Sequence, residues 1–155
     1  MSTADRENQL ERYEDPAAVN SAVEEIFSSL THAIGVGLSI AGLVVLLILT
    51  GRDPSPWKYV SFTVYGVSQI LLFSSSALVH SFFAMPKLRY YLRIVDQAFV
   101  YLLIAGTYTP ITLISMRGPW GWGIFVTVWT LALAGILLKT LVFKKKHIVT
   151  DLLYV

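Results

Sequence analysis

The stretch IFSSLTHAIGVGLSIAGLVVLLILT, residues 26–50, contains no Asp, Glu, Lys or Arg and is apolar over most of its length. A helix needs about 20 mostly apolar residues to cross the hydrocarbon core of a bilayer. This stretch meets that requirement. We therefore predict that it spans a membrane as an α-helix.

Three further stretches of similar character follow, at residues 57–84, 91–115 and 120–143. Of the 155 residues, 55% are hydrophobic and only 14% are charged, which is far from the balance of a soluble domain. We predict an all-α, polytopic transmembrane helix bundle over residues 21–155, after a polar tail at residues 1–20. The tail lacks the apolar core of a secretory signal, so we expect the first span to be retained.

Several function classes are excluded by what the sequence lacks. There is no cysteine, so a metal would have to be bound by histidine or carboxylate. The sequence contains no glycine-rich phosphate loop and no Gly-x-Ser-x-Gly nucleophile turn. The formal net charge of +2 gives no reason to expect a nucleic-acid partner.

The basic residues predict the orientation in the membrane. Nine of them belong to the tail, to the connection between the second and third spans, and to the end of the fourth span (Arg6, Arg12, Lys87, Arg89, Arg93, Lys139, Lys144, Lys145 and Lys146). The other two connections carry three (Arg52, Lys58 and Arg117). Since cytoplasmic loops are enriched in Lys and Arg, we predict a multi-pass protein of the plasma (inner) membrane with a cytoplasmic N-terminus.

Three ionisable side chains interrupt the apolar spans. His32 lies in the first span, His80 near the end of the second and Asp96 near the start of the third. With Ser21-x-x-Glu24 as a capping box at the start of the first helix, all three lie at a similar depth near the cytoplasmic face. Intramembrane ionisable residues usually face a bundle interior or a water-filled cavity. We expect them to converge there.

Each of these side chains belongs to a polar stripe at helical spacing. Glu25, Ser28 and His32 share one face of the first span, and Ser76 and His80 share one face of the second. Other interpretations stay open for some members. Serines and a single histidine also act as hydrogen-bonding groups between membrane helices. A Glu near the start of a helix is also favoured by the helix dipole. Gly35, Gly37 and Gly42 are typical positions for close helix packing.

The segments EEIFSSLTHAIG (24–35), SSALVH (75–80) and DQAFVYLLIAGTYTP (96–110) together resemble the hemolysin III family, the bacterial branch related to the progestin and adipoQ receptors. The resemblance extends from about residue 22 to the end of the chain. It implies a seven-helix fold with a cytoplasmic N-terminus. This chain would then contain about four complete spans, with IVTDLLYV (148–155) as the start of a fifth.

The resemblance also implies a zinc site near the cytoplasmic face. His80 would be a zinc ligand, Asp96 a metal-site and catalytic carboxylate that holds a metal-bound water, and Ser76 a supporting hydrogen-bonding residue. Glu25 and His32 match the first-helix motif, with His32 as a further metal ligand, and Ser28 occupies a place often held by Asn. The family's His-x-x-x-His motif of the last helix is absent, so we expect a truncated chain with an incomplete site.

Three functions remain open. The first is a metal-dependent hydrolase acting on a lipid amide or a similar bond of a lipid-like substrate. The second is a pore-forming or channel protein with cytolytic activity, and the third is a receptor-like role in the lipid bilayer. Polar groups at one depth favour a localised site over a pore. A missing C-terminal fragment or a homo-oligomer would complete the zinc site.

Overall fold

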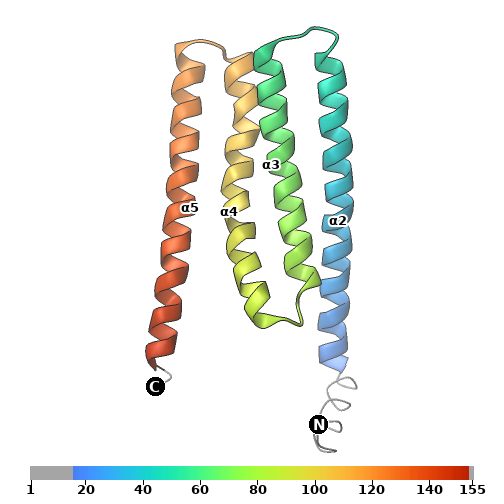
Figure 1. The fold of residues 1–155 in the computed structure, drawn as a ribbon, viewed down its shortest axis with the longest axis vertical. Coiled ribbons are helices and arrows are strands. Elements are labelled where there is room, and N and C mark those ends of the chain that lie inside the picture. The colour runs from blue at the N-terminus through green and yellow to red at the C-terminus, as the bar shows by residue number, and fades with distance from the viewer. Residues whose placement is uncertain (1–15, 154–155) are drawn as a thin grey trace, which may run out of the picture.

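The protein folds into long membrane-spanning helices. The computed structural model describes the backbone of residues 16–153 and the side-chain surroundings of residues 21–141. Within these residues, α2 (Pro16–Thr50), α3 (Pro56–Ser81), α4 (Pro86–Pro110) and α5 (Pro119–Leu153) run alternately up and down (Figure 1), and the short π-helix η1 (Ile111–Ser115) extends α4. All four long helices are long and apolar enough to cross a membrane. The predicted all-α transmembrane architecture is therefore confirmed.

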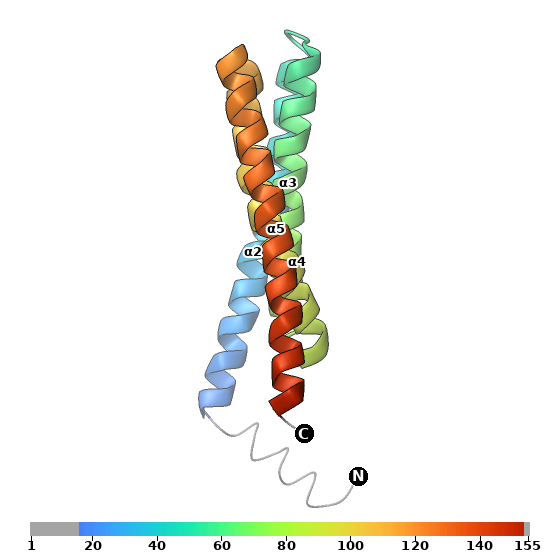
Figure 2. The same ribbon diagram turned by 90° about the vertical axis from the view of Figure 1, so that its left-hand side faces the viewer.

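The long helices pack in chain order. α2 packs against α3, α3 against α4, and α4 against α5, whereas α2 has no backbone contact with α4 or α5 among the described residues. Figure 2, turned by 90°, looks from the α5 side of this row. The arrangement places the first half of α2, the end of α3 and the start of α4 at the same end of the molecule (Figure 1).

Prolines mark the start of every long helix in the described part of the chain. Pro16, Pro56, Pro86 and Pro119 are the first helical residues, a position where the missing N–H costs no hydrogen bond. The turn between η1 and α5 uses Gly118, whose φ of 145° lies in a region that side chains rarely adopt. The short connections follow directly from these breaks, because the residue before a proline is disfavoured in a helical conformation.

The interior of the row is lined by small and hydroxyl side chains. The buried residues include Ser61, Ser68, Thr109 and Thr112, while large apolar side chains such as Ile34 and Leu138 are 63% exposed. This distribution is the reverse of a soluble core. It is the one expected when hydrocarbon surrounds the helices and polar groups turn inward.

Glycines allow several close helix contacts. A methyl group on Gly66 would lie 2.6 Å from the side chain of Leu43, and one on Gly135 would lie 2.7 Å from Tyr101. Gly35 likewise faces Phe73, as predicted, but a methyl group on Gly37 or Gly42 would have nothing within 4 Å. The close-packing prediction was wrong for these two, because their side of α2 has no neighbouring helix among the described residues.

Three helix boundaries differ from the sequence prediction. α2 begins at Pro16, so Ser21 and Glu24 lie inside the helix and do not form its cap. α3 ends at Ser81, three residues before the predicted limit. α5 continues to Leu153 without a break, so residues 148–153 do not start a fifth helix. The sequence after Gly135 contains no Gly or Pro that would end the helix there.

Candidate functional site

Polar side chains from three helices meet at the end of the molecule where α2 begins. We call this set the polar layer; it consists of Glu25, Ser29 and His32 of α2, Ser75, Ser76 and His80 of α3, and Arg89 and Asp96 of α4. The short connection between α3 and α4 places the last turn of one helix beside the first turn of the next. Polar side chains of three spans therefore lie at this end of the molecule. The predicted convergence of His32, His80 and Asp96 on one pocket stays a prediction, since the described contacts of Asp96 are with Ser75 and Ser76.

Asp96 accepts hydrogen bonds from two consecutive serines. The hydroxyl oxygens of Ser75 and Ser76 lie 2.8 and 2.5 Å from the same carboxylate oxygen, Oδ1. Both serines are buried. The Ser75 hydroxyl also lies 2.8 Å from the carbonyl oxygen of Leu72, so its single proton is shared between two acceptors. These contacts orient an intramembrane carboxylate. The supporting role of Ser76 in a metal site stays a prediction.

Glu25 joins the other two helices. Its Oε2 atom lies 2.6 Å from Nδ1 of His80, and its Oε1 atom accepts a hydrogen bond from Nη2 of Arg89. The side chains of Glu25, His80 and Arg89 are 21%, 29% and 25% exposed. One carboxylate of α2 therefore bonds to both α3 and α4, although α2 does not pack against α4.

His32 lies against His80. The two imidazole rings are nearly parallel, with an interplanar angle of 8° and centroids 5.4 Å apart. On its other contact, the His32 ring lies 6.1 Å from the ring of Phe73, measured between centroids. The two histidines of the predicted site are thus neighbours.

The serines of α2 behave differently from one another. Ser29 shares a hydrogen bond of 2.7 Å with Ser81 and lies 3.3 Å from the carbonyl oxygen of Ala77, so it joins α2 to α3. Ser39 bonds instead to the carbonyl of Gly35 in its own helix. For Ser28, the described contact is made by its backbone carbonyl, which accepts from Thr31. A supporting role of the Ser28 side chain stays a prediction.

The donor set can be compared with the needs of a zinc ion. Histidine nitrogens and a carboxylate are suitable ligands, and zinc in proteins usually takes at least three of them. Among the residues with described side chains, however, no group of three or more His, Cys, Asp or Glu lies together as a metal ion requires. His32 and His80 supply two adjacent imidazoles, while Asp96 is bonded to serines. These residues alone do not complete a zinc site.

Three members of the polar layer were not among the site residues predicted from the sequence: Ser29, Ser75 and Arg89. Arg89 was assigned only to a basic connection, and Ser75 was passed over in favour of Ser76. Pro86 gave a usable signal for Arg89, since a proline at the helix start places Arg89 in the first turn, at the depth of Glu25. Ser75 gave no such signal, because two consecutive helix positions point about 100° apart.

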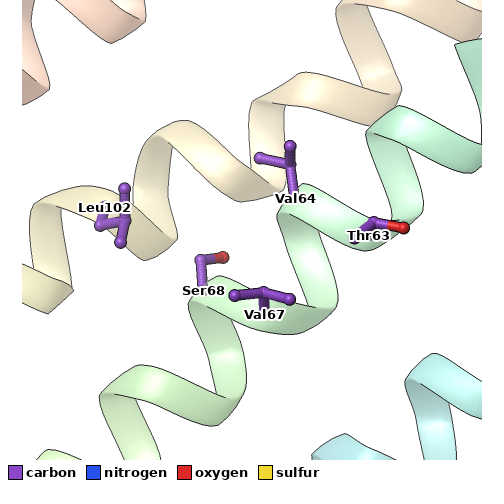
Figure 3. Close-up of a pocket in the computed structure, with 5 residues that line it drawn as sticks. All are labelled: Thr63, Val64, Val67, Ser68 and Leu102. Atoms are coloured by element: carbon purple, nitrogen blue, oxygen red, sulfur yellow. The ribbon is translucent and has the colours of Figure 1, made fainter.

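A separate pocket of ≈ 240 Å³ lies between α3 and α4, away from the polar layer. Its lining residues are mostly apolar (Figure 3): Thr63, Val64, Val67, Ser68 and Leu102. Ser68 donates to the carbonyl of Tyr65 at 2.7 Å. This pocket is about 18 Å along α3 from His80, and it contributes no side chain to the polar layer.

The fold and the polar layer define a multi-pass helical membrane protein with ionisable side chains gathered at one end of its spans. The chain belongs to the haemolysin-III-related family, whose model matches residues 20–155. It is 47% identical over 116 residues to Hemolysin-3 of Bacillus cereus, covering 75% of this chain and 52% of that protein. It is 44% identical over 131 residues to the Hemolysin-3 homolog of Bacillus subtilis (strain 168), covering 84% of this chain and 61% of that protein.

The aligned region therefore spans only about half to three fifths of the length of these two relatives, 52% and 61%. No solved structure matches the chain significantly. The family assignment predicted from the three sequence segments is confirmed.

Proposed function

We propose that the polar layer is part of a zinc-binding site at the cytoplasmic face of a hemolysin III-type membrane protein. In this proposal His80 is the principal ligand and His32 a second one, and the whole protein is a metal-dependent hydrolase of a lipid-like substrate. The observation that carries the proposal is the stacked pair of intramembrane histidines, His32 and His80. Ionisable groups carry a high free-energy cost in a bilayer, so they usually pair with one another or have a functional role.

The described donors set the expected strength of binding. A catalytic zinc site commonly has three protein ligands and an open position for water or substrate. Here two imidazoles lie together, so the further ligands of the proposed site come from elsewhere, either from additional protein or from a second copy. We therefore expect weak zinc binding by this chain alone.

Asp96 has a distinct place in the proposal. Two serine hydroxyls hold one of its carboxylate oxygens, so the side chain is oriented before any ligand arrives. An oriented carboxylate near a binding site is suited to accept a proton from a bound water or hydroxyl group. We assign Asp96 this proton-accepting role and Ser76 the role of its hydrogen-bond donor.

Zinc titration of the full chain in detergent micelles tests the proposal. We expect saturable, weak binding that is lost in His80→Ala and reduced in His32→Ala. His147→Ala, which removes the third histidine of the chain, is the matched control and should bind as the unchanged protein does. Equal zinc binding by His80→Ala and the unchanged protein would refute the site.

The structure offers less support for a pore. A conduction path needs polar groups along its whole length. Away from the polar layer, the buried hydroxyls of Ser68, Thr109 and Thr112 bond to carbonyls of their own helix segments. We expect the chain to release no dye from loaded liposomes. Release that is unchanged in His80→Ala would favour the pore instead.

A further inference from the structure

We propose that Arg89 is a positioning residue for His80, acting through Glu25. Arg89 holds the Glu25 carboxylate, and that carboxylate keeps the proton of His80 on Nδ1 and leaves Nε2 as the free nitrogen. This inference rests on the proposed function in one respect: the proposed function explains why Nε2 of His80 is kept free, namely for a metal or a proton donor. The arrangement itself is formed by three side chains of this chain, Arg89, Glu25 and His80.

The first step follows from hydrogen-bonding chemistry. An ionised carboxylate has only acceptor atoms, so the 2.6 Å contact between Glu25 and His80 requires a proton on Nδ1. A neutral imidazole carries one proton, and Nε2 is then an acceptor with a lone pair. Carboxylates commonly orient metal-binding histidines in this way, because they fix the tautomer and the ring direction.

The second step concerns the charge state of Glu25. A carboxylate at this depth is stabilised in its ionised form only by a charged or donating partner. Arg89 supplies a guanidinium that donates to the oxygen not used by His80. Each carboxylate oxygen therefore has one partner, and the two partners come from different helices.

The third step concerns the other nitrogen atoms of the Arg89 guanidinium. Its Nε atom is buried and has no hydrogen-bond partner in the part of the chain with described side chains. The contact with Glu25 is therefore the ion pair that orients the guanidinium. Because α2 and α4 do not pack against each other, this contact links Glu25 to a helix that lies beyond α3 in the row.

The test records the ring nitrogen signals of His80 by NMR in the metal-free full chain, labelled with ¹⁵N-histidine, in micelles at about pH 8, where an ordinary imidazole is neutral. His80→Ala assigns the signals. We expect a protonated Nδ1 and an unprotonated Nε2 in the unchanged protein. In Arg89→Met we expect loss of this single tautomer, while Arg89→Lys retains it and the exposed control Arg93→Met leaves it unchanged.

A charge swap separates positioning from simple tethering of the helices. Glu25→Arg combined with Arg89→Glu restores an ion pair between α2 and α4 but places a cation beside His80. We expect the swap to recover thermal stability relative to Arg89→Glu alone without recovering the Nδ1-protonated tautomer. Recovery of both would overturn the proposal, as would a proton on Nε2 in the unchanged protein or an unaltered tautomer in Arg89→Met.

These outcomes are independent of zinc binding. If His80 has the expected tautomer but the chain binds no zinc, the positioning role stands and the proposed function fails. If zinc binds through His80 while the tautomer is indifferent to Arg89, the positioning role fails and the proposed function stands.

Discussion

Arg89, in the first turn of α4, donates a hydrogen bond to Glu25 of α2, although these two helices do not pack against each other. The side chains bridge helices that are separated by α3. Glu25 also contacts His80 of α3, so one carboxylate is shared by all three helices. The packing of the row and the chemistry of the polar layer therefore depend on the same residue.

The paired serines make a prediction about stability. Replacing Ser75 or Ser76 by Ala removes one donor to Asp96 and should lower the free energy of unfolding by about 0.6 kcal/mol, a typical value for a hydrogen bond between membrane helices. The double replacement leaves the carboxylate without either donor. We expect its cost to exceed the sum of the single costs, because only the second loss leaves Oδ1 of Asp96 without either serine donor.

Reversible unfolding of the full chain in mixed micelles measures these differences. Ser39→Ala is the matched control, since Ser39 bonds only within its own helix among the described contacts. Strictly additive losses for Ser75 and Ser76 would show that the two hydroxyls do not act on one shared acceptor.

Two glycines at the start of α5 form a matched pair. A methyl group on Gly121 would lie 2.1 Å from the carbonyl oxygen of Met116 and 2.4 Å from that of Thr112, whereas one on Gly123 would have nothing within 4 Å. Backbone atoms cannot move aside as a flexible side chain can. Gly121→Ala should therefore destabilise the protein by about 1–3 kcal/mol. Gly123→Ala should be neutral or stabilise it by up to about 1 kcal/mol, because alanine favours a helix.

Thermal unfolding of the two variants in one detergent provides the comparison. A loss of stability of similar size in both variants would mean that the close backbone contacts at Gly121 do not determine the effect of the substitution.

Much of this architecture could be predicted from the sequence, because spanning a membrane imposes a simple length and composition. The placement of His32 beside His80 was predictable for the same reason, since polar groups in such segments turn inward. The hydrogen-bond partners of these side chains were harder to predict from the sequence. Helical spacing places Glu25 and His32 on one face, but it does not tell which side chain of another helix each one reaches.

The missed contacts have physical causes. Arg89 was counted among the basic residues of a connection, while in the structure α4 begins at Pro86 and carries Arg89 inside its first turn. The capping-box pattern at Ser21 failed because Pro16 starts α2 earlier and the following residues do not interrupt a helix. The prediction of a fifth helix was wrong because a run of lysines does not by itself end a helix, and α5 continues through it.

The orientation in the membrane remains a prediction that single cysteines can test. The chain contains no cysteine, so an introduced one is the only reactive thiol. Pro54→Cys, between α2 and α3, should react with an impermeant reagent added to intact cells, whereas Ala84→Cys, between α3 and α4, should react only after permeabilisation. The reverse pattern would place the N-terminus outside.

The stacking of His32 on His80 allows the ring contact to be separated from the nitrogen chemistry. His32→Phe keeps an aromatic ring beside His80 but removes both nitrogens, and His32→Ala removes the ring as well. If His32 is a zinc ligand, both variants should weaken zinc binding, by about 10-fold or more, while only His32→Ala should also lower the unfolding temperature. Zinc titration and thermal unfolding of the same samples measure the two effects. Zinc affinity retained in His32→Phe but reduced in His32→Ala would assign His32 a packing role and leave His80 as the single histidine ligand of the polar layer.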